Sequence, residues 1–167
     1  TQMAANQGFT IGASLTSGAA NLIYTFGSAE QKTIFCEKMF RGTWSGSMCL
    51  TEPQAGTAVG DAATTATKED AGYYLIKGTK QFITNGDHDM ADNIIHLLLA
   101  RTPAAPEGTK GISLFIVPKI RLDGTPNDVK VVSIEHKMGI NGSPTCLLSF
   151  GENNDCHGFL LKAENIG

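Results

Sequence analysis

The stretch Met48-Cys-Leu-Thr-Glu-Pro-Gln-Ala-Gly-Thr-Ala-Val-Gly-Asp61 decides how we expect this chain to fold. Its apolar first residues are typical of a strand, and Pro53 ends that strand because proline lacks the N–H that a sheet ladder needs. Two glycines further on permit backbone angles and close approaches that other residues resist. Thr51 and Thr57 add hydroxyls, which both donate and accept hydrogen bonds. The pattern predicts a strand that ends in a ligand-facing loop, with an ordinary polar turn between two strands as the alternative.

Two later stretches extend this pattern. Gly78-Thr-Lys-Gln-Phe-Ile-Thr-Asn-Gly86 follows at a distance that two intervening strands would fill, and Lys137-Met-Gly-Ile-Asn-Gly-Ser-Pro-Thr-Cys146 leads into a strand-like Leu-Leu-Ser-Phe150. Taken in this order, the three stretches resemble the motifs of the acyl-CoA dehydrogenase family. In that family a Leu-Thr-Glu-Pro-x-Ala-Gly segment precedes a Lys-x-Trp/Phe-Ile-Thr-Asn-Gly segment, and a late Met-Gly turn precedes a strand.

Composition sets limits on the class of protein. The chain has 167 residues, of which 41% are hydrophobic and 17% charged, with a formal net charge of -3. This length allows one domain with a helical attachment. The scattered basic residues give no reason to expect nucleic acid as a partner. No apolar run reaches the roughly 18 residues that a transmembrane helix needs.

Cysteine and histidine usage is informative about compartment and metals. The four cysteines form no Cys-x-x-Cys pair, and the chain carries no secretory signal, so we expect a reducing compartment, the cytoplasm or alternatively the mitochondrial matrix. The four histidines have no metal-ligand spacing, so we expect no metal site. The start at Thr1 and the end at Gly167 lead us to interpret the chain as a fragment of a longer protein.

Helical signals dominate the first part of the chain. Apolar residues from Thr1 to about Tyr24 recur with the spacing of one helical face. Gly27 is suited to end that helix, and Ser28 with Gln31 predicts a capping box for a second helix that runs to about Phe40. A break at Arg41-Gly-Thr-Trp then separates the helices from the rest of the chain.

Strand signals dominate the remainder. Runs rich in threonine, tyrosine and isoleucine are separated by glycine and proline turns, and they predict short strands at 62–67, 73–76, 81–84, 94–101, 111–117, 129–134, 146–150 and 158–161. The expected fold class is an α+β fragment, with short N-terminal helices and an all-β domain of two packed sheets or an open barrel. By the resemblance, residues 1–44 are a remnant of an N-terminal helical domain, and residues 45–167 are the middle β domain that binds flavin and acyl-CoA.

The resemblance implies FAD as the cofactor. Met48, Leu50 and Thr51 stand where the family presents backbone N–H groups and a hydroxyl to the edge of the flavin ring. Phe82 stands where the family has an aromatic cover for the ring face, and Thr84 follows two residues later, on the same side of a regular strand. Without the resemblance, Phe82 reads as a core residue and Thr84 as an exposed strand threonine.

The loop residues carry further implied roles. Thr57 stands where the family has a serine that contacts the flavin diphosphate and the acyl-CoA, so we expect it to bind both. Ala58 replaces an aspartate that often follows that serine, which removes one acceptor from the loop. Glu52 is not predicted to be a base, because this glutamate belongs to the loop scaffold in the family. No catalytic residue is expected in this chain, since the family's base comes from a C-terminal helical domain.

The implied activity is FAD-dependent dehydrogenation of the Cα–Cβ bond of an acyl-CoA thioester to the enoyl-CoA, in a parent protein that forms a homo-oligomer and passes electrons to an electron-transferring flavoprotein. The segment from Ile134 to Cys146 is most similar to a branch that includes 3-methylmercaptopropionyl-CoA dehydrogenases. Two alternatives stay open: an acyl-CoA oxidase of the same architecture, and a non-catalytic β module that binds acyl-CoA or a protein partner.

Overall fold

The computed structural model describes residues 6–166. Helix α2 (Gln7–Phe26) begins after Asn6, whose side-chain oxygen accepts the Phe9 N–H at 3.0 Å. It ends at Gly27, which donates its N–H to the Ile23 carbonyl at 2.7 Å. The expected first helix is confirmed in this part of the chain, while its predicted first five residues lie outside the described range.

The second helical segment starts with the expected capping box. The Gln31 N–H donates to Ser28 Oγ at 3.1 Å, and the Ser28 N–H donates to Gln31 Oε1 at 3.0 Å. The segment continues through α3 (Ala29–Gln31), a π-helical turn (Lys32–Cys36) and α4 (Glu37–Phe40). Gly42 then adopts a φ of 76°, in the left-handed region that favours glycine, and the chain turns into the sheet.

Eight strands form one mixed sheet. They are β1 (Trp44–Cys49), β2 (Thr65–Lys68), β3 (Tyr74–Thr84), β4 (Asn93–Ala100), β5 (Ser113–Pro118), β6 (Val129–Ile134), β7 (Thr145–Phe150) and β8 (His157–Leu160). The order is β1-β4-β5-β8-β3-β7-β6, with β2 paired to β3 beside this path. Only β1 and β4 run parallel among these pairs. The expected α+β fold is confirmed, in the form of one open sheet.

Strand β3 differs from the prediction. We expected separate strands at 73–76 and 81–84, but the residues between them continue the ladder, with Gly78 opposite Phe150 and Lys80 opposite Leu148 in β7. Gly78 fits here because a Cβ at this position would lie 2.4 Å from Thr64 Oγ1. The glycine that suggested a turn therefore marks a close contact inside a long strand.

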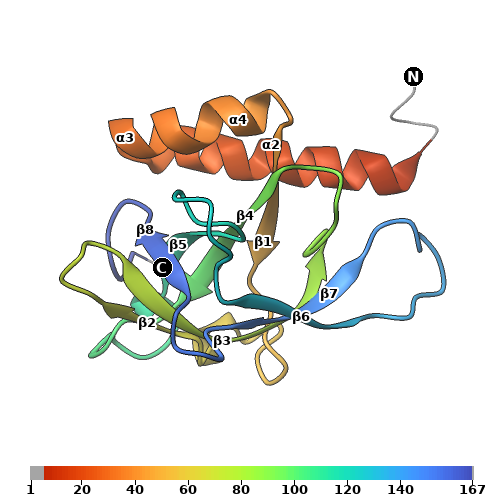
Figure 1. The fold of residues 1–167 in the computed structure, drawn as a ribbon. Coiled ribbons are helices and arrows are strands. Elements are labelled where there is room, and N and C mark those ends of the chain that lie inside the picture. The colour runs from red at the N-terminus through yellow and green to blue at the C-terminus, as the bar shows by residue number, and fades with distance from the viewer. Residues whose placement is uncertain (1–5, 167) are drawn as a thin grey trace.

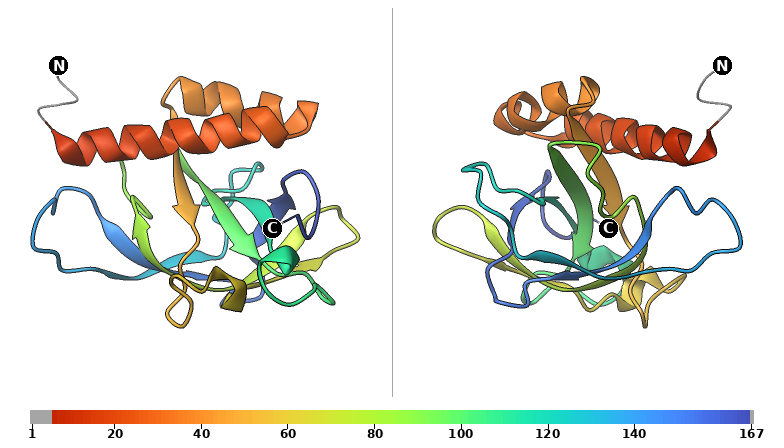
Figure 2. Two further views of the ribbon diagram at one scale, coloured as in Figure 1. Left: turned by 180° about the vertical axis from the view of Figure 1, so that it is seen from behind. Right: turned by 45° about the vertical axis from the view of Figure 1, so that its right-hand side comes forward.

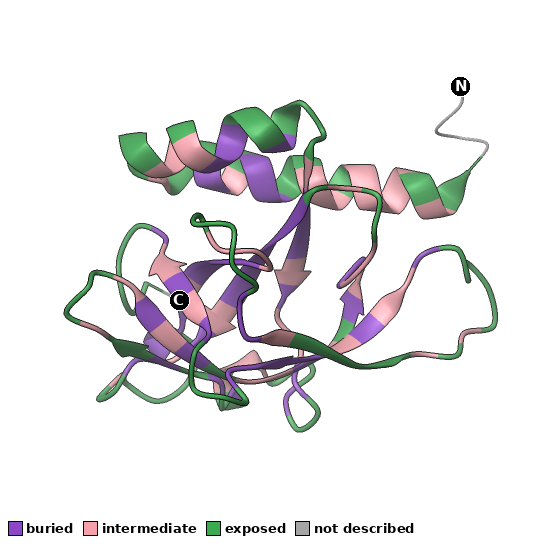
Figure 3. Ribbon diagram, viewed as in Figure 1, coloured by how far each residue is buried: buried purple, intermediate pink, exposed green. Residues whose placement is uncertain are grey.

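The helices and the sheet form two cores. Both helical segments lie on the same side of the sheet, as seen from the front and from behind (Figures 1 and 2). In the first core they pack on β4 and β5, through Ala20, Ile23, Phe35, Ile95, Leu97 and Ile116. The second core lies between the two halves of the bent sheet and includes Ile76, Leu98, Phe115, Leu148 and Phe150. Strand β4 contributes to both cores and is buried along almost its whole length (Figure 3).

Two further features concern membranes and cysteines. Within residues 6–166, no helix is long and apolar enough to cross a membrane. All four cysteines are buried and free.

Gly46 allows α2 to rest directly on β1. A Cβ at this position would lie 2.8 Å from the Ala19 Cβ and 2.9 Å from the Met39 Cε. We expect Gly46→Ala to lower the free energy of unfolding by about 1–3 kcal/mol, because the helix must move away from the strand. Gly18 is the control, since nothing lies near its missing Cβ. Gly18→Ala should raise the free energy of unfolding by about 0.5–1 kcal/mol, through its higher helix propensity. Urea unfolding of both variants measures the difference, and effects of the same sign would contradict this packing role.

Candidate ligand-binding site

A buried ion pair fixes the loop that follows β1. Lys80 Nζ lies 2.8 Å from Glu52 Oε1, and the two side chains are 0% and 2% exposed. The same ammonium donates to the Leu50 carbonyl at 3.1 Å. The Glu52 carboxylate also accepts the backbone N–H groups of Ala63, at 2.7 Å, and Thr64, at 3.1 Å. One carboxylate and one lysine thus tie both ends of the loop to β3.

These contacts determine the charge state of Glu52. Burial by itself would raise the pKa of the carboxyl, but the hydrogen bonds from Lys80, Thr64 and Ala63 outweigh burial and hold the pKa at about 2. Burial lowers the pKa of Lys80, and the contact with Glu52 opposes that shift. With this pKa Glu52 is ionised at neutral pH, and it is enclosed because only 3% of it is exposed. It is placed to support the loop, as expected, and not to take a proton from a ligand.

Phe82 lies at an irregularity of β3. The pairing with β7 shifts register between Lys80 and Ile83, and Phe82 has a φ of 59°. A positive φ is unfavourable for a bulky side chain and persists only where neighbouring contacts hold it. Phe82 is 56% exposed, so its interpretation as a core residue is wrong. The regular alternation that we expected to place Thr84 beside it is interrupted at the same point.

Thr51 is joined through its backbone to the segment of β3 that carries Phe82. Its carbonyl accepts the Gln81 N–H at 2.8 Å, which joins the exit of β1 to the residue before Phe82. The hydroxyls of Thr51, Thr57 and Thr84 form no hydrogen bond with any group of residues 6–166. Leu50 and Thr51 are therefore held against Lys80 and Gln81, just before Phe82, and three hydroxyls are left available to a ligand.

Met48 and Thr57 lie in other directions. The Met48 side chain packs against the core under the helices and lines a pocket of about 580 Å³ between α2 and β1, together with Ile11, Leu15, Leu22 and Leu97. Thr57 is exposed in the loop after β1. Four of the six predicted residues thus belong to β1 and the loop after it, and Phe82 and Thr84 belong to β3. Of the four, Leu50 and Thr51 are hydrogen-bonded to β3.

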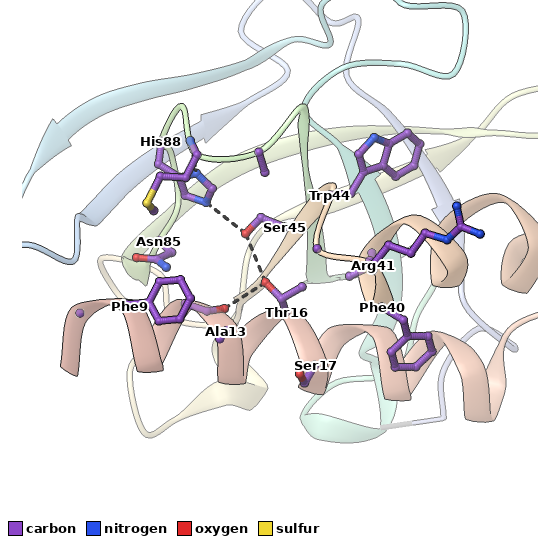
Figure 4. A pocket seen from close by; sticks show the side chains of 16 residues that line it. Phe9, Ala13, Thr16, Ser17, Phe40, Arg41, Trp44, Ser45, Asn85 and His88 are labelled. Carbon is purple, nitrogen blue, oxygen red and sulfur yellow. Dashed lines mark hydrogen bonds between the residues drawn. The ribbon is translucent and has the colours of Figure 1, made fainter. Parts of the chain in front are cut away.

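A second pocket, of about 330 Å³, was not predicted from the sequence. It lies between α2, the turn after α4 and residues 85–91 (Figure 4). At its base His88 Nε2 lies 3.0 Å from Ser45 Oγ, which lies 3.3 Å from Thr16 Oγ1. His88 Nδ1 accepts the Met90 N–H at 3.2 Å, and burial lowers the pKa of His88, so a neutral ring donates from Nε2 to Ser45. No sequence motif joins these three residues, because they come from distant segments.

The fold is that of a β domain that carries a helical layer on one side of its sheet. Within residues 6–166, no group of three or more His, Cys, Asp or Glu side chains is arranged to hold a metal ion. The sequence profile of the acyl-CoA dehydrogenase middle domain matches residues 47–152. The chain therefore belongs to the acyl-CoA dehydrogenase family.

Individual relatives agree with this assignment. The chain is 54% identical over 153 residues to a butyryl-CoA dehydrogenase of Syntrophomonas wolfei, covering 88% of this chain and 25% of that protein. It is 45% identical over 158 residues to the 3-methylmercaptopropionyl-CoA dehydrogenase of Ruegeria pomeroyi, covering 92% of this chain and 26% of that protein. The chain thus spans about a quarter of the length of these relatives.

Solved structures show the same architecture. Butyryl-CoA dehydrogenase from Megasphaera elsdenii superposes with a TM-score of 0.78 at 37% identity, over 97% of this chain and 40% of that one. A structure described as the electron transferring flavoprotein of Acidaminococcus fermentans superposes with a TM-score of 0.73 at 36% identity, over 89% of this chain and 36% of that one.

The ion pair makes the first prediction for this site. We expect Glu52→Gln to lower the free energy of unfolding by about 3–5 kcal/mol, because it leaves the Lys80 charge buried without its partner. Glu152→Gln is the matched control, since the Lys130–Glu152 pair has side chains that are 52% and 45% exposed. The control should change stability far less, because solvent screens an exposed ion pair. Equal losses in chemical denaturation would contradict a special role for the buried pair.

The same pair predicts a pH dependence. The pKa of Glu52 falls from its ordinary 4.5 to about 2 in the folded chain, so its stabilisation is complete above 4.5 and is lost as the pH drops from 4.5 to about 2. The stability gap between the unchanged protein and Glu52→Gln should therefore narrow over that range. A gap that stays constant down to pH 2 would contradict the assignment.

Proposed function

We propose that this chain is the flavin-binding part of an FAD-dependent acyl-CoA dehydrogenase, which oxidises the Cα–Cβ bond of an acyl-CoA to the enoyl-CoA. Residues 1–44 would belong to the helical domain and residues 45–167 to the middle β domain. One observation carries the proposal: Phe82, 56% exposed, directly follows Gln81, whose N–H binds the Thr51 carbonyl, on a frame held by a buried ion pair.

The residues present fit a flavin. A flat ring system needs an apolar or aromatic surface on one face and hydrogen-bonding groups at its edge, and Phe82 and Thr51 offer one of each. We assign Met48, Leu50 and Thr51 to the ring edge, Phe82 to the ring face and Thr84 to the same contact region. When bound, FAD would supply the acceptor for the hydride that leaves the substrate. The protein's share is to hold the substrate in line with that acceptor and to exclude water.

Thr57 is the residue that we assign to acyl-CoA and to the flavin diphosphate, because its hydroxyl is exposed and unpaired at the loop after β1. The α-proton must go to a base that is close to the substrate and has a suitable pKa. Glu52 does not meet this requirement, because its pKa of about 2 makes it a weak base and Lys80 occupies it. We therefore place the base outside this chain.

The remaining assignments concern partners and location. We propose an electron-transferring flavoprotein as the electron acceptor, as the resemblance to the family implies. We also propose a homo-oligomeric parent protein. A cytoplasmic location, or the mitochondrial matrix, suits four buried cysteines that are all free.

The function is tested on the full-length protein that carries this chain. We expect it to purify with FAD and to bleach the flavin absorbance band anaerobically with an acyl-CoA, in a panel of short to long chains. Residues 1–167 alone should not bleach the band, because the base is missing. Rapid hydrogen peroxide formation in air would favour the oxidase, and a colourless protein that ignores FAD would favour the non-catalytic module.

Phe82→Ala tests the aromatic cover in the same protein. We expect the FAD dissociation constant to rise about tenfold or more, because the flavin loses both the stacking contact with the Phe82 ring and the burial of the covered face. Phe26→Ala is the control, an aromatic of α2 that is 44% exposed and is assigned no ligand contact. Flavin fluorescence titration compares the two variants. If Phe82→Ala retains FAD as tightly as Phe26→Ala, the ring is not the cover.

A further inference from the structure

Arg101, directly after β4, lies between two loops. The first loop spans residues 52–64 and carries Thr57, and the second spans residues 102–111. The Arg101 guanidinium donates to two backbone carbonyls of each loop, those of Ala62 (2.9 Å), Gly60, Pro106 (2.8 Å) and Gly108 (2.6 Å). Within residues 6–166, no carboxylate lies within ion-pair distance of this guanidinium. Its donors are committed to the two loops.

The two loops touch through their backbones at this point. A Cβ at Gly60 would lie 3.1 Å from the Gly108 Cα and 3.2 Å from the Thr109 N. A Cβ at Gly111 would lie 2.5 Å from Arg101 Nη1. The glycines leave room for the guanidinium to reach carbonyls on both sides. The nearest neighbour of Gly60 is therefore the second loop.

The backbone of Arg101 adds two further ties to the first loop and the strand after it. Its N–H donates to the Thr64 carbonyl at 2.9 Å, and its carbonyl accepts the Ala66 N–H at 2.8 Å. The side chain therefore starts from a fixed position. It reaches the carbonyls from a residue that is itself held in the sheet.

Arg101 and Glu52 bind complementary groups of the first loop. The Glu52 carboxylate accepts the N–H groups of Ala63 and Thr64, and the Arg101 guanidinium donates to the carbonyls of Gly60 and Ala62. Hydrogen bonds with one charged partner are stronger than neutral ones. The closing end of the loop is therefore held by a negative group on one side and a positive group on the other.

We propose that Arg101 is a positioning residue for acyl-CoA binding, which holds the loop so that the Thr57 hydroxyl faces the ligand. The proposal rests on the proposed function, because the ligand role of Thr57 belongs to it. Lysine cannot replace arginine here, since a single ammonium cannot place donors on carbonyls of two loops as a planar guanidinium does. The geometry of the donors, and not the charge alone, carries the role.

The test uses Arg101→Lys and Arg101→Gln in the full-length, FAD-loaded protein. Hydrogen exchange followed by mass spectrometry reports on peptides from the two loops. In both variants we expect exchange in both loops to accelerate about tenfold or more, and the acyl-CoA dissociation constant to rise about tenfold, because several charged hydrogen bonds are lost. The flavin absorbance band should be retained.

Two controls separate positioning from other effects. Thr57→Ala should weaken acyl-CoA binding and leave loop exchange unchanged, because it removes the contact and keeps the frame. Arg121→Lys should change neither readout, since Arg121 pairs with Asp155 and lies outside both loops. Should the Arg101 variants fail to fold, Gly108→Ala is used, because its φ of 72° is strained for alanine and disturbs two acceptors while Arg101 stays in place.

Loops that stay protected in Arg101→Lys or in Gly108→Ala would overturn the proposal. Loops that open while acyl-CoA binding stays unchanged would overturn it as well. Failure of the proposed function looks different, because the unchanged protein would then bind no FAD, or would not bleach its flavin band with any acyl-CoA. The exchange measurement would still decide whether Arg101 holds the two loops.

Discussion

The buried pair of Lys80 and Glu52 is the constraint on which the strand-end site depends. Removing two charges from water is costly, and their mutual attraction offsets that cost only when the remaining donors and acceptors also find partners. Here the lysine also reaches the Leu50 carbonyl, and the carboxylate also accepts two backbone N–H groups. Each of these contacts connects segments that are distant in sequence. The pair therefore specifies one register between the exit of β1, its loop and the middle of β3.

The exposure of Phe82 follows from that register. In a regular strand Lys80 and Ile83 would point to opposite faces, because side chains alternate with a period of two. Both are buried, at 0% and 2% exposure. Both side chains can face inward because β3 has one extra residue between them. The shift of register against β7 between Lys80 and Ile83 marks this extra residue. The positive φ of Phe82 is the local consequence. It leaves the aromatic ring exposed, although Lys80 and Ile83 on either side of the bulge are buried.

Local chemistry explains which features could be predicted from the sequence. The capping box at Ser28 and Gln31, the helix end at Gly27 and most strand positions depend on near neighbours, so pattern reasoning located them. The continuity of β3 depends on pairing with β7, which no local signal carries, and Gly78 therefore suggested a turn. The carbonyl contacts of Arg101 and the hydrogen bonds between Thr16, Ser45 and His88 also join distant segments. Motif resemblance supplied the candidate site residues, but the bulge that exposes Phe82 and the ion pair beneath the loop required the fold.

The hydrogen bonds of Arg101 and Glu52 also bear on Ala58, which replaces the aspartate of the family pattern. A lost aspartate in a binding loop could alter the conformation of the loop or only its contacts with ligand. In this chain the carbonyls and N–H groups at the closing end of the loop are held by Arg101 and Glu52, and these hydrogen bonds do not involve position 58. The local turn there is made by backbone alone, with the Asp61 N–H on the Ala58 carbonyl at 2.9 Å. The loop conformation is therefore independent of the missing carboxylate, and the substitution acts on what the loop presents to a ligand, where Thr57 retains a free hydroxyl.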